Sequence, residues 1–389
     1  MVGAAPGVLD RGRQRPAGRQ RGGGTFVRVV TFGEVMLRLA PEDFLRVRQA
    51  IPGRLEATFG GGELNVAVSI AQQGGRAAFL TSVPENVIGE AFVQELRKLN
   101  VETDLVRRAS VGRFGIYFVE TGANQRSGTV TYDREGSSIS RESSTAYDWE
   151  VAFRDAHWFH ITGITPAISA PAADAAVAAV RHAKQAGLTV SCDLNFRKKL
   201  WNWKPGVPPQ SLARETMRNL LPFVDLVIAN EEDAEQVLGI HAPQSDVAAG
   251  RLNSAGYVEV ARRIVAEFPN VRQVAITLRE SISASHNNWG GMLYDAQSAT
   301  AHFAPVDAEN RHVPYEIRDI VDRVGAGDSF AGALIFALND ASLSAPQTAL
   351  GYAVAASCLK HSIKGDFNYV TRNEIEALLR GSGSGRVQR

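Results

Sequence analysis

Short apolar runs alternate with segments of helical periodicity along most of the chain, and this alternation constrains the fold more than any other feature. Strand-like runs occupy residues 27–32, 77–82, 156–162, 189–193, 226–230 and 274–278. Helical periodicity occupies residues 63–73, 88–98, 171–185 and 258–267. Strands separated by helices pair in parallel and are covered by helices on both faces. The sequence therefore predicts an α/β domain built on a mainly parallel sheet.

Residues 115–132 break this alternation. Gly115 to Val119 and Gly128 to Tyr132 alternate apolar and polar side chains, and the polar segment 121–128 joins them. This pattern is typical of a β-hairpin. With residues 41–58, the hairpin is predicted to form a small antiparallel β lid over one edge of the main sheet. The lid segments are placed at about 41–58 and 113–136.

The two ends of the chain differ in composition from the rest. Residues 1–25 are rich in Arg, Gly and Pro and lack apolar periodicity, which predicts a disordered basic extension. An arm that contacts RNA or a membrane is the alternative. Residues 381–389 are predicted to be a flexible tail, which leaves residues 26–380 as one domain with its lid.

Charge and cysteine content narrow the class of protein. The 389 residues carry a formal net charge of +1, which gives no sign of nucleic-acid binding. No apolar run approaches the roughly 20 residues that span a bilayer. Only two cysteines occur, which favours a reducing compartment. We therefore expect a cytoplasmic protein that binds neither nucleic acid nor membrane.

A glycine-rich turn precedes the last strongly apolar helix, predicted at 329–338. Gly325, Ala326 and Gly327 form this turn, which follows a strand end predicted at 320–322, and Asp328 follows the turn. Small residues at a helix N-terminus let backbone N–H groups approach an anion, and the helix dipole favours negative charge. Asp328 could accept a proton from an attacking hydroxyl. A glycine turn capped by an aspartate would look the same.

The residues around this turn favour the first interpretation. The run from Asp322 to Gly332 resembles the C-terminal signature of ribokinase-like (phosphofructokinase-B-type) carbohydrate kinases, and Gly60-Gly61-Gly-Glu-Leu-Asn65 resembles their N-terminal signature. The resemblance implies a ribokinase-like three-layer αβα sandwich with a β lid, which phosphorylates a sugar with ATP and Mg²⁺. It implies that Asp328 is the base and that Gly325, Ala326 and Gly327 form the anion hole.

The same resemblance suggests a nucleotide side. Asn230-Glu-Glu-Asp233 is similar to a magnesium-associated N-x-x-E element, so Asp233 and Glu232 are candidate metal ligands, although Asp233 departs from the pattern. Candidate nucleotide contacts are Asn230, Thr277, Arg279 and Asn368. Members of this family often hold a monovalent cation beside the anion hole, and the loop that contains Asp322 would bind it.

The acceptor is suggested by two groups of residues. Asp193, Asn195 and Arg197 follow a strand at alternate positions, which would place them on one face. Tyr117, Tyr132 and Arg134 of the hairpin resemble the set that lines the sugar-acid pocket of 2-keto-3-deoxygluconate kinases. Two arginines suit a carboxylate, because a guanidinium can pair with it bidentately.

We therefore expect ATP-dependent phosphorylation of 2-keto-3-deoxygluconate, with Gly61 and Asn65 also holding the sugar acid. A fructokinase, or another sugar kinase of this fold, is the nearest alternative. A non-catalytic sugar-binding regulatory protein is the alternative from another class. Because lids of this kind often pair between subunits, a homo-oligomer is expected.

Overall fold

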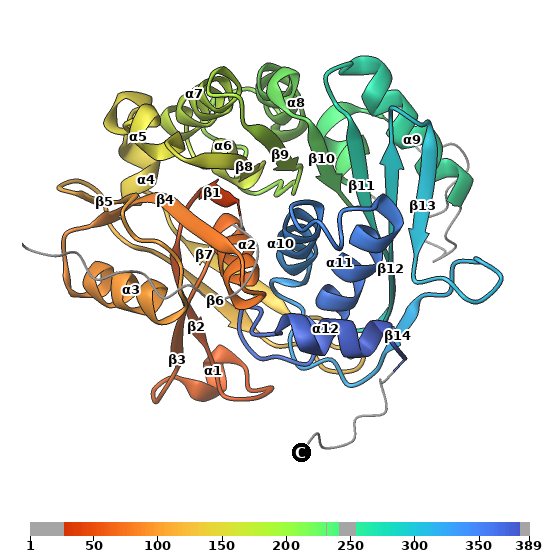
Figure 1. Ribbon diagram of the computed structural model, residues 1–389. Helices are drawn as coiled ribbons and strands as arrows, with labels where there is room; N and C mark the ends of the chain where they lie inside the picture. Colours follow the sequence, from red (N-terminus) through yellow and green to blue (C-terminus); the bar gives the residue numbers. More distant parts are fainter. Residues whose placement is uncertain (1–26, 231, 241–253, 382–389) are drawn as a thin grey trace, which may run out of the picture.

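The computed structural model describes residues 27–230, 232–240 and 254–381 (Figure 1). Within these ranges the larger sheet has the strand order β13-β12-β11-β10-β9-β8-β1-β4-β5, with β14 paired to β12. Its strands are β1 (Arg28–Phe32), β4 (Arg76–Pro84), β5 (Val106–Ala109), β8 (Ala156–Thr162), β9 (Thr189–Asp193), β10 (Leu226–Ala229), β11 (Gln273–Ser283), β12 (His286–Asp295), β13 (Thr300–Ala304) and β14 (Tyr315–Ile317). From β5 to β11 every pairing is parallel, which confirms the predicted class of fold.

Helices cover both faces of this sheet, as Figure 1 shows. The principal helices of one layer are α5 (Trp149–Phe153), α7 (Ala170–Gln185), α8 (Pro209–Leu220) and α9 (Ser254–Glu267). Those of the other are α2 (Gly62–Gln72), α3 (Val87–Lys98), α10 (Ala326–Leu338), α11 (Pro346–Lys360) and α12 (Arg372–Leu379). Short helical segments connect the main elements: α4 (Ser138–Arg141), η1 (Ser144–Ala146), α6 (Ile164–Ala167), η2 (Leu221–Phe223) and the π-helical η3 (Ala234–Leu238).

Strand β1 explains why the sheet needs a layer on each side. All five of its residues are buried. Val30 and Phe32 belong to one hydrophobic core, whereas Val29 between them belongs to the other. Successive side chains of a strand point to opposite faces, so a strand that is buried at every position must lie between two layers.

One edge of the sheet differs from the prediction. The run 274–278 is part of the longer strand β11, which pairs antiparallel with β12, and β12 pairs antiparallel with β13. Residues 320–322 were predicted to end a strand, but they are irregular, with a bend at Val321, and the nearest preceding strand is β14. Asp322 is nevertheless held in place by polar contacts described below.

The smaller sheet is the lid, with the order β3-β2-β6-β7. Its strands are β2 (Met36–Ala40), β3 (Glu56–Gly60), β6 (Gly115–Glu120) and β7 (Thr129–Asp133), and α1 (Val47–Ala50) lies between the first two. The β6–β7 hairpin is antiparallel as predicted, but β2 pairs with β6 in parallel. The first lid segment also begins earlier than position 41, because β2 follows β1 after three residues.

The predicted basic extension and most of the predicted tail lie outside the described residues. Within the described ranges, every helix is too short or too polar to cross a lipid bilayer.

Candidate active site

A cavity of about 320 Å³ lies where the carboxyl ends of the central strands meet the N-termini of α2 and α10. This edge is where open α/β sheets bind their ligands. Predicted acceptor residues that line it are Gly61, Asn65, Tyr117, Tyr132, Arg134 and Arg197. Predicted phosphate, metal and nucleotide residues that line it are Asn230, Asp233, Thr277, Arg279, Gly325, Ala326, Gly327 and Asp328. Residues from widely separated parts of the chain therefore share one cavity.

The glycine turn forms the N-terminus of α10. Gly325 is its N-cap with φ 81°, in the left-handed region that favours glycine. A Cβ at this position would also lie 2.1 Å from the carbonyl oxygen of Asp366, so glycine is required on two grounds. Ala326 and Gly327 occupy the first helical turn, where backbone N–H groups lack intrahelical acceptors. These groups and the helix dipole can stabilise an anion.

Asp328 lies in the same first turn and is partly buried. Its Oδ2 accepts a hydrogen bond of 2.7 Å from Asn65 Nδ2. Burial raises the pKa of Asp328 to about 7, with the hydrogen bond from Asn65 opposing the shift and the charge of Asp366 adding to it. A carboxylate with a pKa near neutrality can take a proton from a hydroxyl, as a general base requires.

Asn65 is positioned by the first turn of α2. Gly61, the N-cap, is packed so closely that a Cβ would lie 2.1 Å from the carbonyl oxygen of Glu34. The buried Glu63 accepts hydrogen bonds at Oε1 from the backbone N–H and hydroxyl of Thr162, at 2.9 and 2.8 Å, and from Thr165 Oγ1 at 2.7 Å. Glu63 therefore fixes the start of α2 to the end of β8. Burial raises its pKa.

The lid contributes the wall opposite α2. Tyr117 is buried, and the Arg134 guanidinium lies 5.3 Å from the ring centroid of Tyr132. The Arg134 guanidinium also pairs with the buried carboxylate of Glu34, a residue that sequence reasoning missed. Within the described part of the chain, Glu34 Oε1, Arg134 Nε and Asn65 Oδ1 are buried atoms without a hydrogen-bond partner. Buried polar atoms are normally paired, so these three indicate a polar ligand.

The segment after β9 reaches the same cavity, although it is not extended as predicted. Asn195 has φ 37°, which bends the chain. Asp193, Asn195 and Arg197 nevertheless all line the cavity. Arg197 is exposed, and its Nη1 donates a hydrogen bond of 3.0 Å to the carbonyl of Phe196. Its guanidinium is therefore available to a ligand.

The candidate metal residues fit in part. Asp233 is buried, and its two carboxylate oxygens accept hydrogen bonds from the backbone N–H groups of Phe196 and Asn230, at 3.0 and 3.1 Å. Glu232 is exposed and does not line the cavity. Burial raises the pKa of Asp193 well above its ordinary value, and the nearby charges of Asp233 and Asp328 raise it further. A cation between Asp193 and Asp233 would relieve this repulsion.

No group of three or more His, Cys, Asp or Glu side chains that could hold a metal ion occurs among the described residues. The two aspartates suit Mg²⁺, because this ion keeps much of its water shell and needs only one or two protein carboxylates beside the phosphates.

Two arginines place positive charge in the part of the cavity that is predicted to bind the nucleotide phosphates. Arg279 and Thr277 line the cavity as predicted. Arg323, which follows Asp322 in the C-terminal signature and for which no role was predicted, lines it as well. Arg323 Nε donates a 2.8 Å hydrogen bond to the carbonyl of Ala284. Burial lowers the pKa of Arg323, and the nearby charge of Arg279 adds to this shift. Two like charges held close together favour an anionic ligand between them.

A family model for pfkB family carbohydrate kinases matches residues 27–277. The chain belongs to this family. It is therefore a carbohydrate kinase, and membership in the family implies the use of ATP and Mg²⁺.

Relatives of this pfkB kinase include proteins named as 2-dehydro-3-deoxygalactonokinase and 2-dehydro-3-deoxygluconokinase. It is 32% identical over 360 residues to a 2-dehydro-3-deoxygalactonokinase of Haloferax volcanii, covering 92% of this chain and 98% of the relative. The crystal structure of a 2-dehydro-3-deoxygluconokinase from Thermotoga maritima matches with a TM-score of 0.81 and 43% identity, over 91% of this chain and all of that one. A probable fructokinase of Arabidopsis thaliana is 27% identical over 361 residues, covering 90% of this chain and 82% of the relative.

Asn368 was predicted to contact the nucleotide, but in this pfkB kinase it lies outside the cavity. Its Nδ2 donates hydrogen bonds to Ser329 Oγ at 2.6 Å and Ser69 Oγ at 3.4 Å, and its Oδ1 accepts one from the N–H of Val370 at 3.0 Å. The side chain is buried and does not line the cavity. Asn368 therefore joins α2, α10 and the loop after α11, and the prediction of an adenine contact needs this correction.

The residues around Asp322 do not fit the monovalent cation that was expected there. Asp322 Oδ1 accepts a hydrogen bond from the N–H of Val324 at 3.0 Å. Asp322 Oδ2 accepts hydrogen bonds from the N–H of Gly365 at 3.1 Å and from Arg38 Nη2 at 2.5 Å. A protein guanidinium thus already supplies the positive charge at this carboxylate.

Proposed function

We propose that this chain transfers the γ-phosphoryl group of ATP to the primary hydroxyl of 2-keto-3-deoxygluconate, giving the 6-phosphate. The observation that carries this proposal is the buried polar set of Glu34, Asn65 and Arg134, which lines one cavity with Asp328 and the N-terminus of α10. The relatives named for 2-dehydro-3-deoxy sugar acids add support.

The polar set suits an acid that also carries hydroxyl groups. Glu34 Oε1 and Asn65 Oδ1 are acceptors for hydroxyl hydrogens, and Arg134 Nε is a donor. Because Glu34 already balances the charge of Arg134, the exposed Arg197 is the better partner for the carboxylate of the substrate. A guanidinium pairs with a carboxylate through two parallel hydrogen bonds.

In the proposed reaction, Asp328 accepts the proton of the attacking hydroxyl while that oxygen forms a bond to the γ-phosphorus. The bond from that phosphorus to the β,γ-bridging oxygen breaks, and ADP leaves. The N–H groups at the start of α10, with Arg279 and Arg323, stabilise the negative charge on the transferring group. Mg²⁺ held near Asp193 and Asp233 would neutralise phosphate charge when bound.

The base assignment is tested with Asp328→Asn. We expect kcat to fall by at least about 10² with little change in the KM of either substrate, since only proton transfer is removed. An assay that couples ADP release to NADH oxidation measures this over a panel of sugar acids and neutral sugars. Turnover near the wild-type value in Asp328→Asn would refute the assignment, and a preference for fructose over every sugar acid would indicate a fructokinase.

Acceptor recognition is tested with Arg197→Leu. We expect the KM for the sugar acid to rise about tenfold or more while the KM for ATP stays unchanged, because one charge-assisted pair is lost. Lys198→Leu is the matched control, since Lys198 is an exposed neighbour of like charge that does not line the cavity. Equal effects of the two substitutions would argue against a carboxylate contact at Arg197.

A further inference from the structure

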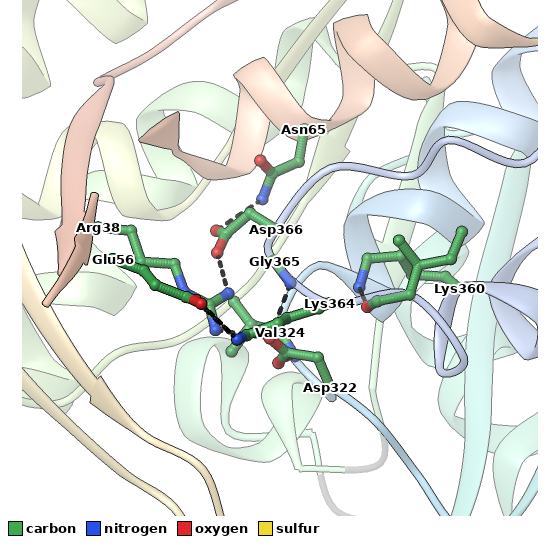
Figure 2. A network of polar contacts seen from close by, with 10 residues as sticks. Arg38, Glu56, Asn65, Asp322, Val324, Lys360, Lys364, Gly365 and Asp366 are labelled. Atoms are coloured by element: carbon green, nitrogen blue, oxygen red, sulfur yellow. Dashed lines mark hydrogen bonds and ion pairs between the residues drawn. The ribbon is translucent and has the colours of Figure 1, made fainter. Parts of the chain in front are cut away.

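Arg38 is a buried arginine of lid strand β2 that reaches the two loops beside the anion site (Figure 2). Its guanidinium bridges two buried carboxylates, with Nη2 2.5 Å from Asp322 Oδ2 and Nη1 2.7 Å from Asp366 Oδ1. The side chain is only 3% exposed. A buried guanidinium is costly unless it is paired, and here two carboxylates pair with it.

Both carboxylates belong to segments that shape the start of α10. Asp322 precedes the glycine turn by three residues and accepts a hydrogen bond from the N–H of Val324. The carbonyl oxygen of Asp366 packs against the Cα of Gly325, which leaves no room for a Cβ. Arg38 therefore holds together the two segments that determine where the N–H groups of α10 point.

The network also reaches the proposed base. Asn65 Nδ2 donates to Asp366 Oδ2 at 3.3 Å and to Asp328 Oδ2 at 2.7 Å. Arg38 thus connects through Asp366 and Asn65 to Asp328, and Figure 2 shows the first three side chains in a row. The charge of Asp366 is one of the influences that raise the pKa of Asp328, so the cation paired with Asp366 bears on the base.

A second basic group lies behind the cluster. Lys360 is fully buried, and its Nζ donates a 3.0 Å hydrogen bond to the carbonyl of Ile363. Burial lowers its pKa, and the charges of Asp322 and Asp366 oppose that shift. Two basic and two acidic groups are therefore gathered beside α10, and Arg38 is the one that bridges both acids.

We propose that the Arg38 guanidinium takes the place of a bound monovalent cation in this kinase. Arg38 is then a positioning residue, which holds the anion site and the Asn65–Asp328 pair in their places. The proposal rests on the proposed function, in which Asp328 is the base. A fixed guanidinium needs no ion from solution, so turnover does not depend on which monovalent cation is present.

The first experiment compares salts on the wild-type protein. Kinase activity, measured directly as ADP formed without coupling enzymes, and a thermal melt are compared in KCl, NaCl and tetramethylammonium chloride at one ionic strength, with ATP as its tetramethylammonium salt. We expect the same kcat, within about twofold, and the same Tm in all three, because nothing binds differentially to the folded state. Activation by K⁺ or Na⁺ of about fivefold or more over tetramethylammonium, or a Tm raised by either ion, would overturn the proposal.

The second experiment removes the guanidinium. Arg38→Ala should lower kcat by about tenfold to a hundredfold, as misplaced groups do, with smaller changes in KM. Added guanidinium ion or K⁺ should restore kcat by about fivefold or more and raise the Tm of the variant above its value in tetramethylammonium. The proposal fails if Arg38→Ala keeps the wild-type kcat. It also fails if the variant is folded and inactive, and neither ion changes its kcat or its Tm.

A matched control comes from the same two parts of the chain. Glu56 of lid strand β3 pairs with Lys364 at 2.7 Å, in the loop that carries Asp366, but both side chains are about half exposed. Glu56→Gln breaks this second link between lid and loop and should leave kcat unchanged and independent of the salt. A loss in Glu56→Gln equal to that in Arg38→Ala would mean that any lid link suffices, and would overturn the special role of Arg38.

If Arg38→Ala does not fold, the double variant Arg38→Met with Asp322→Asn removes the cation together with one acid and avoids the excess negative charge. Its kcat should still fall, whereas a wild-type kcat would overturn the proposal. The melting measurements use no sugar, so a wrong acceptor leaves them unaffected. If the base assignment is wrong, the Asp328→Asn variant keeps its activity, and this result is distinct from a failure of the proposal for Arg38.

Discussion

At the scale of a single residue, the burial of Asp328 has two effects. It raises the pKa of the carboxyl group, which makes the carboxylate a better base, and it makes the charged form unfavourable for folding. Its pKa of about 7 means that it is half protonated near neutrality. Only the deprotonated form accepts a proton, so kcat/KM should rise with pH through about 7 and level off above it. A pH profile of kcat/KM measures this, and a flat profile between pH 6 and 8 would contradict it.

The same shift affects stability, with a sign that can be worked out. The pKa of Asp328 is raised from 3.8, so folding becomes less favourable as pH rises from 3.8 to about 7, and the full cost is present above that range. Asp328→Asn should therefore raise the free energy of unfolding at pH 8 by roughly 1–3 kcal/mol, with no gain near pH 3.8. Urea unfolding at both pH values measures this difference.

Asp133→Asn is a control, because the pKa of Asp133 is shifted in the opposite direction to that of Asp328. The Arg113 guanidinium lowers the pKa of Asp133, so its carboxylate favours folding above the ordinary pKa, and removing it should not stabilise the protein at pH 8. Stabilisation by both substitutions would mean that pKa shifts do not explain the effect at Asp328.

At the scale of elements, the N-terminus of α10 depends on one glycine more than on its neighbour. Gly325→Ala would place a Cβ against the carbonyl of Asp366 at a positive φ, and should lower the free energy of unfolding by at least about 2 kcal/mol. A Cβ at Gly327 meets nothing within 4 Å, so Gly327→Ala should change the stability by no more than about 1 kcal/mol, in the stabilising direction. Equal losses in a denaturant titration would contradict this account.

The main elements were largely predictable because their signals are local. The runs 156–162 and 189–193 coincide with β8 and β9, and the glycine turn gives the position of α10. The β11–β12 hairpin was missed because the segment around Ser283 contains no glycine turn. The parallel pairing of β2 with β6 was also missed, since alternation of side chains specifies a face and not the direction of the neighbouring strand.

The site residues that sequence reasoning missed depend on distant partners. Glu34 and Arg134 are 100 positions apart, and Arg38 and Asp322 are 284 apart. In the sequence, Glu34 is a single charged residue between two apolar runs and Arg38 is a single charged residue within one, and no spacing marks either of them. Asn368 was assigned to the correct loop, but Asp366, two residues earlier, is the member of that loop that lines the cavity. Local motifs therefore identify the cavity, and the ion pairs around it require the fold.

On the scale of the whole molecule, the lid should be the least protected sheet. The outer strands β3 and β7 are mostly exposed, whereas every residue of β1 is buried. Segments with few buried contacts open more readily. We expect backbone amides of β3 and β7 to exchange hydrogen faster than those of β1 and β8, as measured by mass spectrometry.

Ligand binding should slow hydrogen exchange in the lid and leave the helices far from the cavity unchanged. A sugar acid with a non-hydrolysable ATP analogue should slow exchange in β7 and the following residues, because Tyr132 and Arg134 line the cavity. Helix α7 packs in the other hydrophobic core and serves as the internal control. Slower exchange in α7 as large as that in β7 would indicate general stabilisation instead of lid closure.

The link between β2 and the C-terminal loops limits how such kinases can be recombined. The lid forms a sheet of its own, and exchanging lids between relatives is an obvious way to change the sugar that is accepted. If the donor lid lacked an arginine at the position of Arg38, the buried carboxylates of Asp322 and Asp366 would lose the guanidinium that pairs with both of them. Specificity in this protein therefore cannot be transplanted as a lid alone, because the graft must carry its own counterpart to two acids encoded 284 and 328 codons away.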